Sequence, residues 1–342
     1  MTKRQRTILF FAAALLFLLA TPTVILYSQG WRIDWNEKTV THTGGMYMRA
    51  VPSRASIYVN GEFVKRTDLF FDSSLITNLL PGNYNVRIEK EGYIPWTKTL
   101  PVQKAQVTEA KHIILFPENL QFQTLFSNVM LASLSPDASL FAFQKKLDAT
   151  TWELTSFDIA NNQEKVLFEA PAGSQLQSIQ WAPDSNTLLL QSSRNGKEQQ
   201  VKLGARGSEE VLNQEAPALP EEEIPPAETF EVLPNGVVSP DEKNLLILDG
   251  NTIAFYDKET KEQVALGTFK NEPKNLAWLD NDHIFFSVLD DIFASELDVR
   301  GKGPNSVALG TFKNPELFWS PDLKTLFVLS EGKFLSSETL LP

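Results

Sequence analysis

The stretch Pro81–Trp96, PGNYNVRIEKEGYIPW, decides the fold of the region around it. A Pro-Gly turn leads into a segment that places Tyr84, Val86 and Ile88 on one face and polar residues on the other. A charged Lys-Glu-Gly turn follows, and the stretch closes on large aromatic side chains, ending with Trp96. This pattern predicts a short strand with one buried face, bounded by tight turns.

The residues before and after this stretch carry the same kind of signal. Ala55, Ile57 and Val59 alternate with polar residues and run directly into Asn60-Gly61. Asn-Gly between alternating runs is a strong hairpin signal, because both residues tolerate positive φ. Further strands are expected at 96–100 and 112–115. The sequence therefore predicts a small β-sandwich of antiparallel strands over residues 46–117.

At these residues the chain resembles a PEGA domain. The resemblance rests on PSRASIYVNGEFV, on LLPGNYNVRIEKEGYIPW and on a last strand that ends at Leu115. Sandwiches of the carboxypeptidase-regulatory or transthyretin-like type share the turn and strand pattern, and the first of these segments favours the PEGA domain. Where the motif that names the family has a small residue after the glycine, this chain has Tyr93. The resemblance implies an extracytoplasmic module of surface proteins, structural or adhesive rather than catalytic.

A different phrase repeats beyond Pro117. Its five copies are LSPDASLFAF, WAPDSNTLLL, VSPDEKNLLIL, WLDNDHIFFSV and WSPDLKTLFVL. Their equivalent positions, Pro136, Pro183, Pro240, Asp280 and Pro321, are 47, 57, 40 and 41 residues apart. A period of about 40 to 45 residues is typical of the four-stranded blades of a β-propeller. In the four phrases that contain proline, it sets φ for a turn, and in the phrases generally aspartate is expected to bond back to the backbone of that turn.

The strands around these phrases predict how the ring closes. A third strand follows each phrase, and fourth strands are expected after the first four, among them EEVLN at 209–213. The fifth repeat lacks a fourth strand, and NLQFQTLFSN, ahead of the first phrase, can supply it. The region resembles WD40-like or TolB-type propellers and predicts five blades over residues 118–342. A six-bladed ring, with its sixth member inside a long insertion, is the alternative.

That insertion spans residues 207–237. From Gly207 to Glu242 the chain has ten acidic residues, no basic residue, and prolines at 217, 220, 225, 226, 234 and 240. Such a composition buries too little apolar surface to order itself, so a solvated loop on the propeller is expected. The stretch supplies much of the net charge of −11.

The N-terminus predicts an anchor in a membrane. Residues 1–6 hold Lys3, Arg4 and Arg6, and residues 7–27 are apolar and uncharged over about 30 Å as a helix. The basic flank predicts a single-pass helix in the plasma membrane with a cytoplasmic N-terminus and an extracytoplasmic body. A cleaved signal peptide is the alternative, but no clean cleavage site follows the apolar run. Residues 28–45 form a polar stem, either a short strand pair or a spacer.

The sequence shows no pattern of a catalytic, cofactor or metal site. The chain has no cysteine, and its histidines, His42, His112 and His283, lie in three different regions without metal-ligand spacing. The acidic pairs Asp280/Asp282 and Asp290/Asp291 could imitate a glycosidase or calcium site, but acids in strand turns are usually caps. An isoelectric point near 4.9 argues against nucleic acid as a partner.

The sequence as a whole predicts an all-β protein with an N-terminal transmembrane helix, a PEGA-like sandwich and a β-propeller. The function that fits this organisation is a membrane-anchored, non-catalytic binding or scaffolding protein of the cell envelope, without a cofactor. Its expected partner is an envelope protein or a cell-wall glycan. The alternatives are an envelope-assembly factor similar to TolB and, less favoured, an extracytoplasmic hydrolase of wall glycans or peptides.

Overall fold

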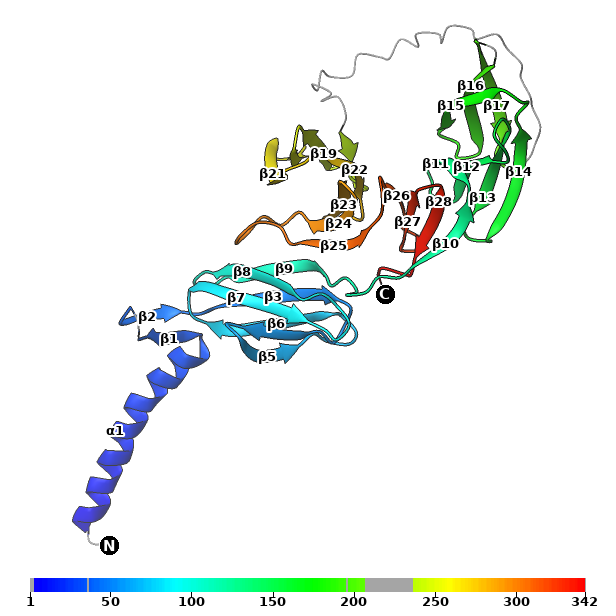
Figure 1. Cartoon of the computed structure of the whole chain (residues 1–342). Coiled ribbons are helices and arrows are strands. Elements are labelled where there is room, and N and C mark those ends of the chain that lie inside the picture. Colours follow the sequence, from blue (N-terminus) through cyan, green and yellow to red (C-terminus); the bar gives the residue numbers. More distant parts are fainter. Residues whose placement is uncertain (1–2, 36, 195, 207–235, 342) are drawn as a thin grey trace. The chain divides into compact units, whose positions relative to one another are not determined.

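The computed structural model describes residues 3–35, 37–194, 196–206 and 236–341. One helix, α1 (Lys3–Ser28), precedes the strands β1 to β28 (Figure 1). The chain divides into two compact units. The first comprises Met1–Leu115 and Val299–Asn305, and the second comprises Phe116–Asp298 and Ser306–Pro342.

Helix α1 forms over a long run of apolar residues, because a helix pairs the backbone N–H and C=O groups within its own segment. Its side chains from Arg4 to Ser28 are exposed with the exception of Thr21, which is half-buried, so no part of the described protein covers them. Pro22 lies inside the helix without ending it. The helix ends at Ser28, and the turn after it contains Gly30, whose φ of 90° is open to glycine and costly for other residues.

The stem is a strand pair that returns the chain to the end of the helix. Strands β1 (Trp31–Asp34) and β2 (Thr39–His42) pair antiparallel. The backbone N–H of Thr43 then donates to Gly30 O at 2.9 Å, and its hydroxyl donates to the same oxygen at 2.8 Å. The next strand therefore starts beside the C-terminal end of α1.

The rest of the first unit is a sandwich of two sheets. Their strands, in spatial order, are β5 (Glu62–Arg66), β4 (Ser56–Val59), β7 (Gly82–Glu89) and β8 (Trp96–Val102) in one sheet, and β6 (Ser73–Leu79), β3 (Gly44–Val51) and β9 (Val107–Ile114) in the other. Asn60 and Gly61 have φ of 52° and 87° and connect β4 to β5 as the predicted two-residue turn.

The predicted faces of the decisive stretch are confirmed. Val86 and Ile88 are fully buried, and Tyr84 packs partly buried against the same core, while Asn85 and Arg87 are exposed. The expectation that all strands are antiparallel is wrong for one pair, because β3 and β9 are parallel. After β8 the chain crosses to the other sheet, and β9 enters it in the same direction as β3.

The second unit consists of repeated antiparallel sheets. Its described part holds five of them: β11 (Val129–Leu134), β12 (Leu140–Lys146), β13 (Trp152–Asp158), β14 (Gln163–Glu169); β15 (Ser174–Trp181), β16 (Thr187–Arg194), β17 (Lys197–Gly204); β18 (Val237–Val238), β19 (Asn244–Asp249), β20 (Thr252–Asp257), β21 (Glu262–Thr268); β22 (Pro273–Trp278), β23 (His283–Val288), β24 (Asp291–Glu296), β25 (Ser306–Thr311); and β26 (Glu316–Ser320), β27 (Thr325–Ser330), β28 (Lys333–Ser337), β10 (Phe122–Ser127). Sequential strands pair within each sheet, as in propeller blades. The fourth strand expected at 209–213 and the acidic insertion up to residue 235 lie outside the described residues.

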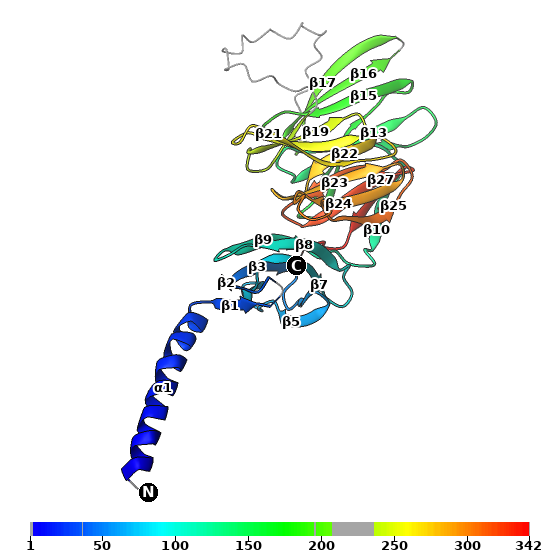
Figure 2. The same cartoon turned by 90° about the vertical axis from the view of Figure 1, so that its left-hand side faces the viewer.

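The closing strand is where the sequence predicts it. β10 pairs antiparallel with β28, with Phe122 opposite Ser337 and Ser127 opposite Lys333. The first and last strands of the second unit therefore share one sheet, which Figure 2 shows as β10 beside the strands at the C-terminal end.

The turns of the repeated phrase are built on their aspartates, as predicted for four of the five copies. Oδ1 of the aspartate accepts the backbone N–H two residues later in each case: Asp137 from Ser139, Asp184 from Asn186, Asp241 from Lys243 and Asp280 from Asp282, at 2.8–3.2 Å. These bonds fix the turn between the first and second strand of each sheet.

The tryptophans of the phrase join neighbouring sheets. The indole N–H of Trp181 donates to Ser133 O at 3.2 Å, from β15 to β11, and that of Trp278 donates to Val237 O at 2.7 Å, from β22 to β18. Trp319 occupies the corresponding place in β26, but its buried Nε1 has no hydrogen-bond partner among the described residues. Its ring packs against Phe285 of β23, with centroids 5.3 Å apart.

The difference in hydrogen bonding between Trp278 and Trp319 predicts that replacing each by phenylalanine lowers the free energy of unfolding by a different amount. Trp278→Phe should lower the free energy of unfolding by about 1 kcal/mol more than Trp319→Phe, because both remove the same atoms but the first also breaks a hydrogen bond. Urea unfolding followed by far-ultraviolet circular dichroism measures both values, with Trp181→Phe as a second hydrogen-bonded case. A larger loss for Trp319→Phe would show that its N–H does have a partner.

Candidate functional site

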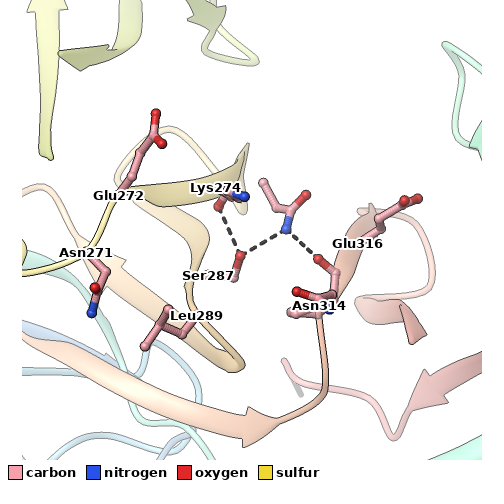
Figure 3. A pocket seen from close by; sticks show the side chains of 9 residues that line it. Asn271, Glu272, Lys274, Ser287, Leu289, Asn314 and Glu316 are labelled. Carbon is pink, nitrogen blue, oxygen red and sulfur yellow. Dashed lines mark hydrogen bonds between the residues drawn. The ribbon is translucent and has the colours of Figure 1, made fainter. Parts of the chain in front are cut away.

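The best candidate for a binding site is a polar pocket of about 530 Å³ in the second unit. It lies where β22 and β23 of one sheet approach the start of β26 in the next (Figure 3). The residues that line it are Asn271, Glu272, Lys274, Asn275, Ser287, Leu289, Asn314, Pro315 and Glu316. Its volume is within the range of small-ligand pockets, but its lining is more polar than is usual for them.

Asn275 organises the walls of the pocket. Its φ of 55° places it in the left-handed region, inside the shift of register between Lys274 and Ala277 of β22. Its side-chain amide donates to Ser287 Oγ at 2.9 Å and to Pro315 O at 2.5 Å. One side chain thus joins two strands of its own sheet to the loop before the next sheet.

The pocket combines opposite charges with fixed amides. In Figure 3, the side chains of Glu272 and Glu316 lie on opposite sides of the pocket. Lys274 also lines the pocket and brings the opposite charge. Partial burial of its carboxylate raises the pKa of Glu316 above the ordinary glutamate value, although the residue as a whole is exposed. Such a lining fits a ligand rich in hydroxyl or amide groups, such as a glycan or a peptide.

The same pocket lacks an activated nucleophile among the residues that line it. Ser287 is 2% exposed, and its hydroxyl donates to Lys274 O at 3.4 Å while accepting from Asn275. A hydroxyl that attacks a substrate must be accessible and must donate to a base, and this one does neither. The Ser287 hydroxyl is therefore not arranged as a nucleophile in this pocket.

His283 and Asp280 form a hydrogen-bonded pair in which the histidine is buried and the Asp280 side chain is 41% exposed. The His283 side chain is 2% exposed, and its Nδ1 lies 3.0 and 3.2 Å from the two carboxylate oxygens of Asp280. Burial opposes ionisation of Asp280, but the hydrogen bond and charge of His283 and the nearby N–H groups outweigh it and hold the pKa of Asp280 below its ordinary value. The pair fixes the turn between β22 and β23.

This lowered pKa predicts a pH dependence of stability. Because the folded-state pKa of Asp280 lies below its unfolded value of about 3.9, its ionised form contributes stability that is present above that pH and is lost as the pH falls below it. Asp280→Asn should therefore be less stable than the parent at neutral pH, with the difference shrinking under acid conditions. Melting temperatures between neutral and acid pH test this, and a constant difference would contradict it.

The other acidic pair considered from sequence is bonded to the end of the neighbouring strand β25 and the loop after it. Asp290 Oδ1 accepts the N–H of Asn314 at 3.1 Å, and Asp291 Oδ1 accepts the hydroxyl of Thr311 at 2.6 Å. His42 lies in β2 and His112 in β9, away from His283 in sequence and in a different unit. Over the described ranges, no three His, Cys, Asp or Glu residues come together as a metal site.

The pocket residues carry no signal that sequence reasoning could use. Asn275 follows no motif, and its importance comes from a positive φ and a register shift that appear only once β22 and β23 are paired. No site residue is predicted from the sequence, and Lys274, Asn275 and Glu316 are candidates that only the fold brings together.

Comparison with known proteins gives one family match. Residues 43–114 match the model of the PEGA domain. No curated protein matches the chain in sequence.

Solved structures similar to this chain include several propeller proteins. TolB from Acinetobacter baumannii is 12% identical, with a TM-score of 0.28, and the match covers 74% of this chain and 59% of TolB. The β-propeller domain of the trilobed protease from Pyrococcus furiosus is 14% identical, with a TM-score of 0.34 over 86% of this chain and 93% of that one. A mitotic checkpoint complex is 12% identical, with a TM-score of 0.31 over 77% and 86%.

The family match covers the β3 to β9 sandwich, and the repeated antiparallel sheets follow it in the chain. Residues 43–114 are a PEGA domain, and this domain is joined to a unit of propeller-like sheets.

Proposed function

We propose that this chain is a membrane-anchored binding and scaffolding protein of the cell envelope, with its body outside the plasma membrane and without catalytic activity. The observation that carries the proposal is α1, which is long and apolar enough to cross a membrane and is not covered by the described protein. A signal sequence has the same two properties, so support for a retained anchor has to come from the junction after the helix.

That junction favours a retained anchor. The helix continues without a break to Ser28, and the carbonyl of Gly30 accepts two hydrogen bonds from Thr43. Signal peptides end in a small-x-small site that must be accessible to the peptidase. Here the residues after the helix are paired into the first folded unit, and Tyr27 and Trp31 flank the end of the apolar run, where aromatic side chains would meet the interface of a membrane that holds α1.

The orientation has a direct test. A reporter that works only outside the membrane, fused after Pro342, should be active, and changing Lys3, Arg4 and Arg6 to Glu should reduce correct insertion, because basic residues hold the N-terminus in the cytoplasm. Activity of a cytoplasm-only reporter at the same site would reverse the orientation. Mass spectrometry determines where the mature protein begins. An N-terminus after residue 28 would show that the helix is a cleaved signal peptide and not an anchor.

The binding role is proposed for the pocket lined by Lys274, Asn275 and Glu316. Its polar lining and its buried, bonded serine support a ligand of the envelope, either a wall glycan or a segment of an envelope protein. Full-length protein in detergent should retain such a ligand from envelope extract, and the double variant Lys274→Ala, Glu316→Ala should not. The variant Lys324→Ala, on a turn outside the pocket, is the control, and equal retention by all three proteins would place binding elsewhere.

The blade number completes the proposal. We favour a five-bladed ring in which β10 supplies the outer strand of the last blade. Sheets β15–β17 and β18–β21 flank residues 207–235, so a sixth blade would have to form within that segment. Removal of residues 214–234, which spares the fourth strand expected at 209–213, separates the two arrangements, because a five-bladed ring keeps its stability without these residues.

A further inference from the structure

One edge of the PEGA domain carries an unusual number of exposed apolar side chains. Strands β5 and β6 are the outer strands of their two sheets, and the loop 67–72 connects them at that edge. The apolar residues there are Phe63, Val64, Leu69, Phe70, Phe71 and Leu75, which we call the aromatic edge. Phe70 and Phe71 are 82% and 73% exposed, values that a phenyl group in water does not favour.

The loop that carries these phenyl groups is held in place. Asp68 Oδ1 accepts the backbone N–H of Phe70 at 2.7 Å and that of Phe71 at 3.1 Å. The N–H of Asp68 donates to Ser73 O at 2.8 Å, and the N–H of Ala50 donates to Asp72 O at 2.9 Å. The two phenylalanines are therefore displayed outward by a bonded turn, which lowers the entropy lost when they enter an apolar phase.

The same edge is joined to the end of the membrane helix. The Arg32 guanidinium donates to Tyr27 O of α1 at 2.7 Å and to Asn78 Oδ1 of β6 at 2.9 Å. From Asn78, strand β6 runs back past Leu75 to Ser73, a distance of about 17 Å at the rise of a strand. The Asn78 end of β6 is thus tied to the helix, and the aromatic edge lies along the same outer strand and in the loop at its other end.

We propose that the aromatic edge lies in the interfacial layer of the bilayer that holds α1, so that the PEGA domain rests on the membrane through Phe70 and Phe71. This inference rests on the proposed anchoring of α1. Phenyl groups that enter the boundary between headgroups and acyl chains, about 5–10 Å deep, lose their contact with water. Continuity with the helix favours lipid as the occupant over a separate protein.

The charges of the edge define the kind of contact. Lys65 and Arg66 are balanced by Glu62, Asp68 and Asp72, two basic against three acidic groups. Net attraction to anionic headgroups is therefore absent, and the contact should depend on apolar burial. We expect it to persist at high salt and in bilayers of phosphatidylcholine alone, unlike adsorption through a polybasic patch.

The chain has no cysteine, so one introduced cysteine can carry one fluorescent label. We would label Leu69→Cys, which leaves both phenylalanines in place, with an environment-sensitive dye in full-length protein in phosphatidylcholine nanodiscs. Lys111→Cys, on β9 at the opposite edge and toward the same end of the sandwich, is the matched control. Leu16→Cys on α1 reports on anchoring itself.

The label at residue 69 should be quenched by lipids with a shallow spin label, and iodide in water should quench it several-fold less than the label at 111. Both differences should disappear when Phe70→Ser and Phe71→Ser are added. Equal access of iodide to 69 and 111 would overturn the proposal, and so would protection from iodide without lipid quenching, which means cover by protein such as a second copy. A label at 16 that lipids do not quench would instead refute the anchor.

Discussion

Chains that lack residues 333–342 should lose the cooperative unfolding transition of the propeller-like unit. Strand β28 lies between β27 and β10 and pairs with both, so its removal leaves β10 without a partner and exposes an unpaired edge. Phe334 is also lost, a fully buried residue whose ring centroid lies 4.6 Å from that of Phe143 and 4.8 Å from that of Phe141. Truncation of one such phenylalanine alone costs about 3–5 kcal/mol.

Thermal unfolding followed by circular dichroism measures the effect of this deletion. Two other variants are compared in the same experiment. Phe334→Ala keeps the strand and should lower the melting temperature without abolishing the transition, because it removes the aromatic contacts alone. Deletion of 214–234, which removes more residues than the C-terminal deletion but spares the strand expected at 209–213, should leave the melting temperature close to that of the parent. An unchanged transition after loss of 333–342 would contradict closure through β10, and a large loss after deletion of 214–234 would favour six blades.

Local pattern was sufficient to predict most of the fold, because the decisive features are short-range. Alternation around Val86 and Ile88 predicts their burial, and Asn60-Gly61 predicts its two-residue turn. The repeated aspartates predict their own backbone bonds, and the missing fourth strand of the last repeat predicts the pairing of β10 with β28. In each case, the local side chains or the number of strands in the repeat permit few other structures.

Features that depend on long-range register could not be predicted. The parallel pairing of β3 with β9 depends on which sheet the chain enters after β8. No residue near that crossing predicts which sheet this is. The pocket depends on Asn275 reaching Pro315, forty residues later in the chain, across two sheets. The exposure of Phe70 and Phe71 could not be predicted from the sequence either, because consecutive large apolar residues are usually buried in a core.

Ile88→Ala should destabilise the PEGA domain by about 2–5 kcal/mol. Ile88 has no exposed surface, and it lies opposite Ile57 of β4, which is also fully buried, so the lost methyl groups leave a cavity that fixed neighbours cannot fill. Val86 of β7 and Leu100 of β8 belong to the same buried cluster and are also fully buried. A domain of this size has little stability in reserve, so such a loss approaches the total.

Hydrogen exchange with mass spectrometry on the full-length protein in detergent measures this loss for each unit separately. Exchange should accelerate in peptides from residues 43–114 and stay unchanged in peptides from residues 122–298, because Ile88 lies in the core of the first unit. Arg87→Ala is the matched control: Arg87 is the preceding residue of β7, it points to solvent and pairs with Glu89 at the surface, so its loss should cost under about 1 kcal/mol. A larger effect for Arg87→Ala than for Ile88→Ala would mean that β7 turns its other face to the core. Acceleration in both units by Ile88→Ala would mean that they unfold as one, and the division of the chain at residue 115 would then describe its geometry but not its stability.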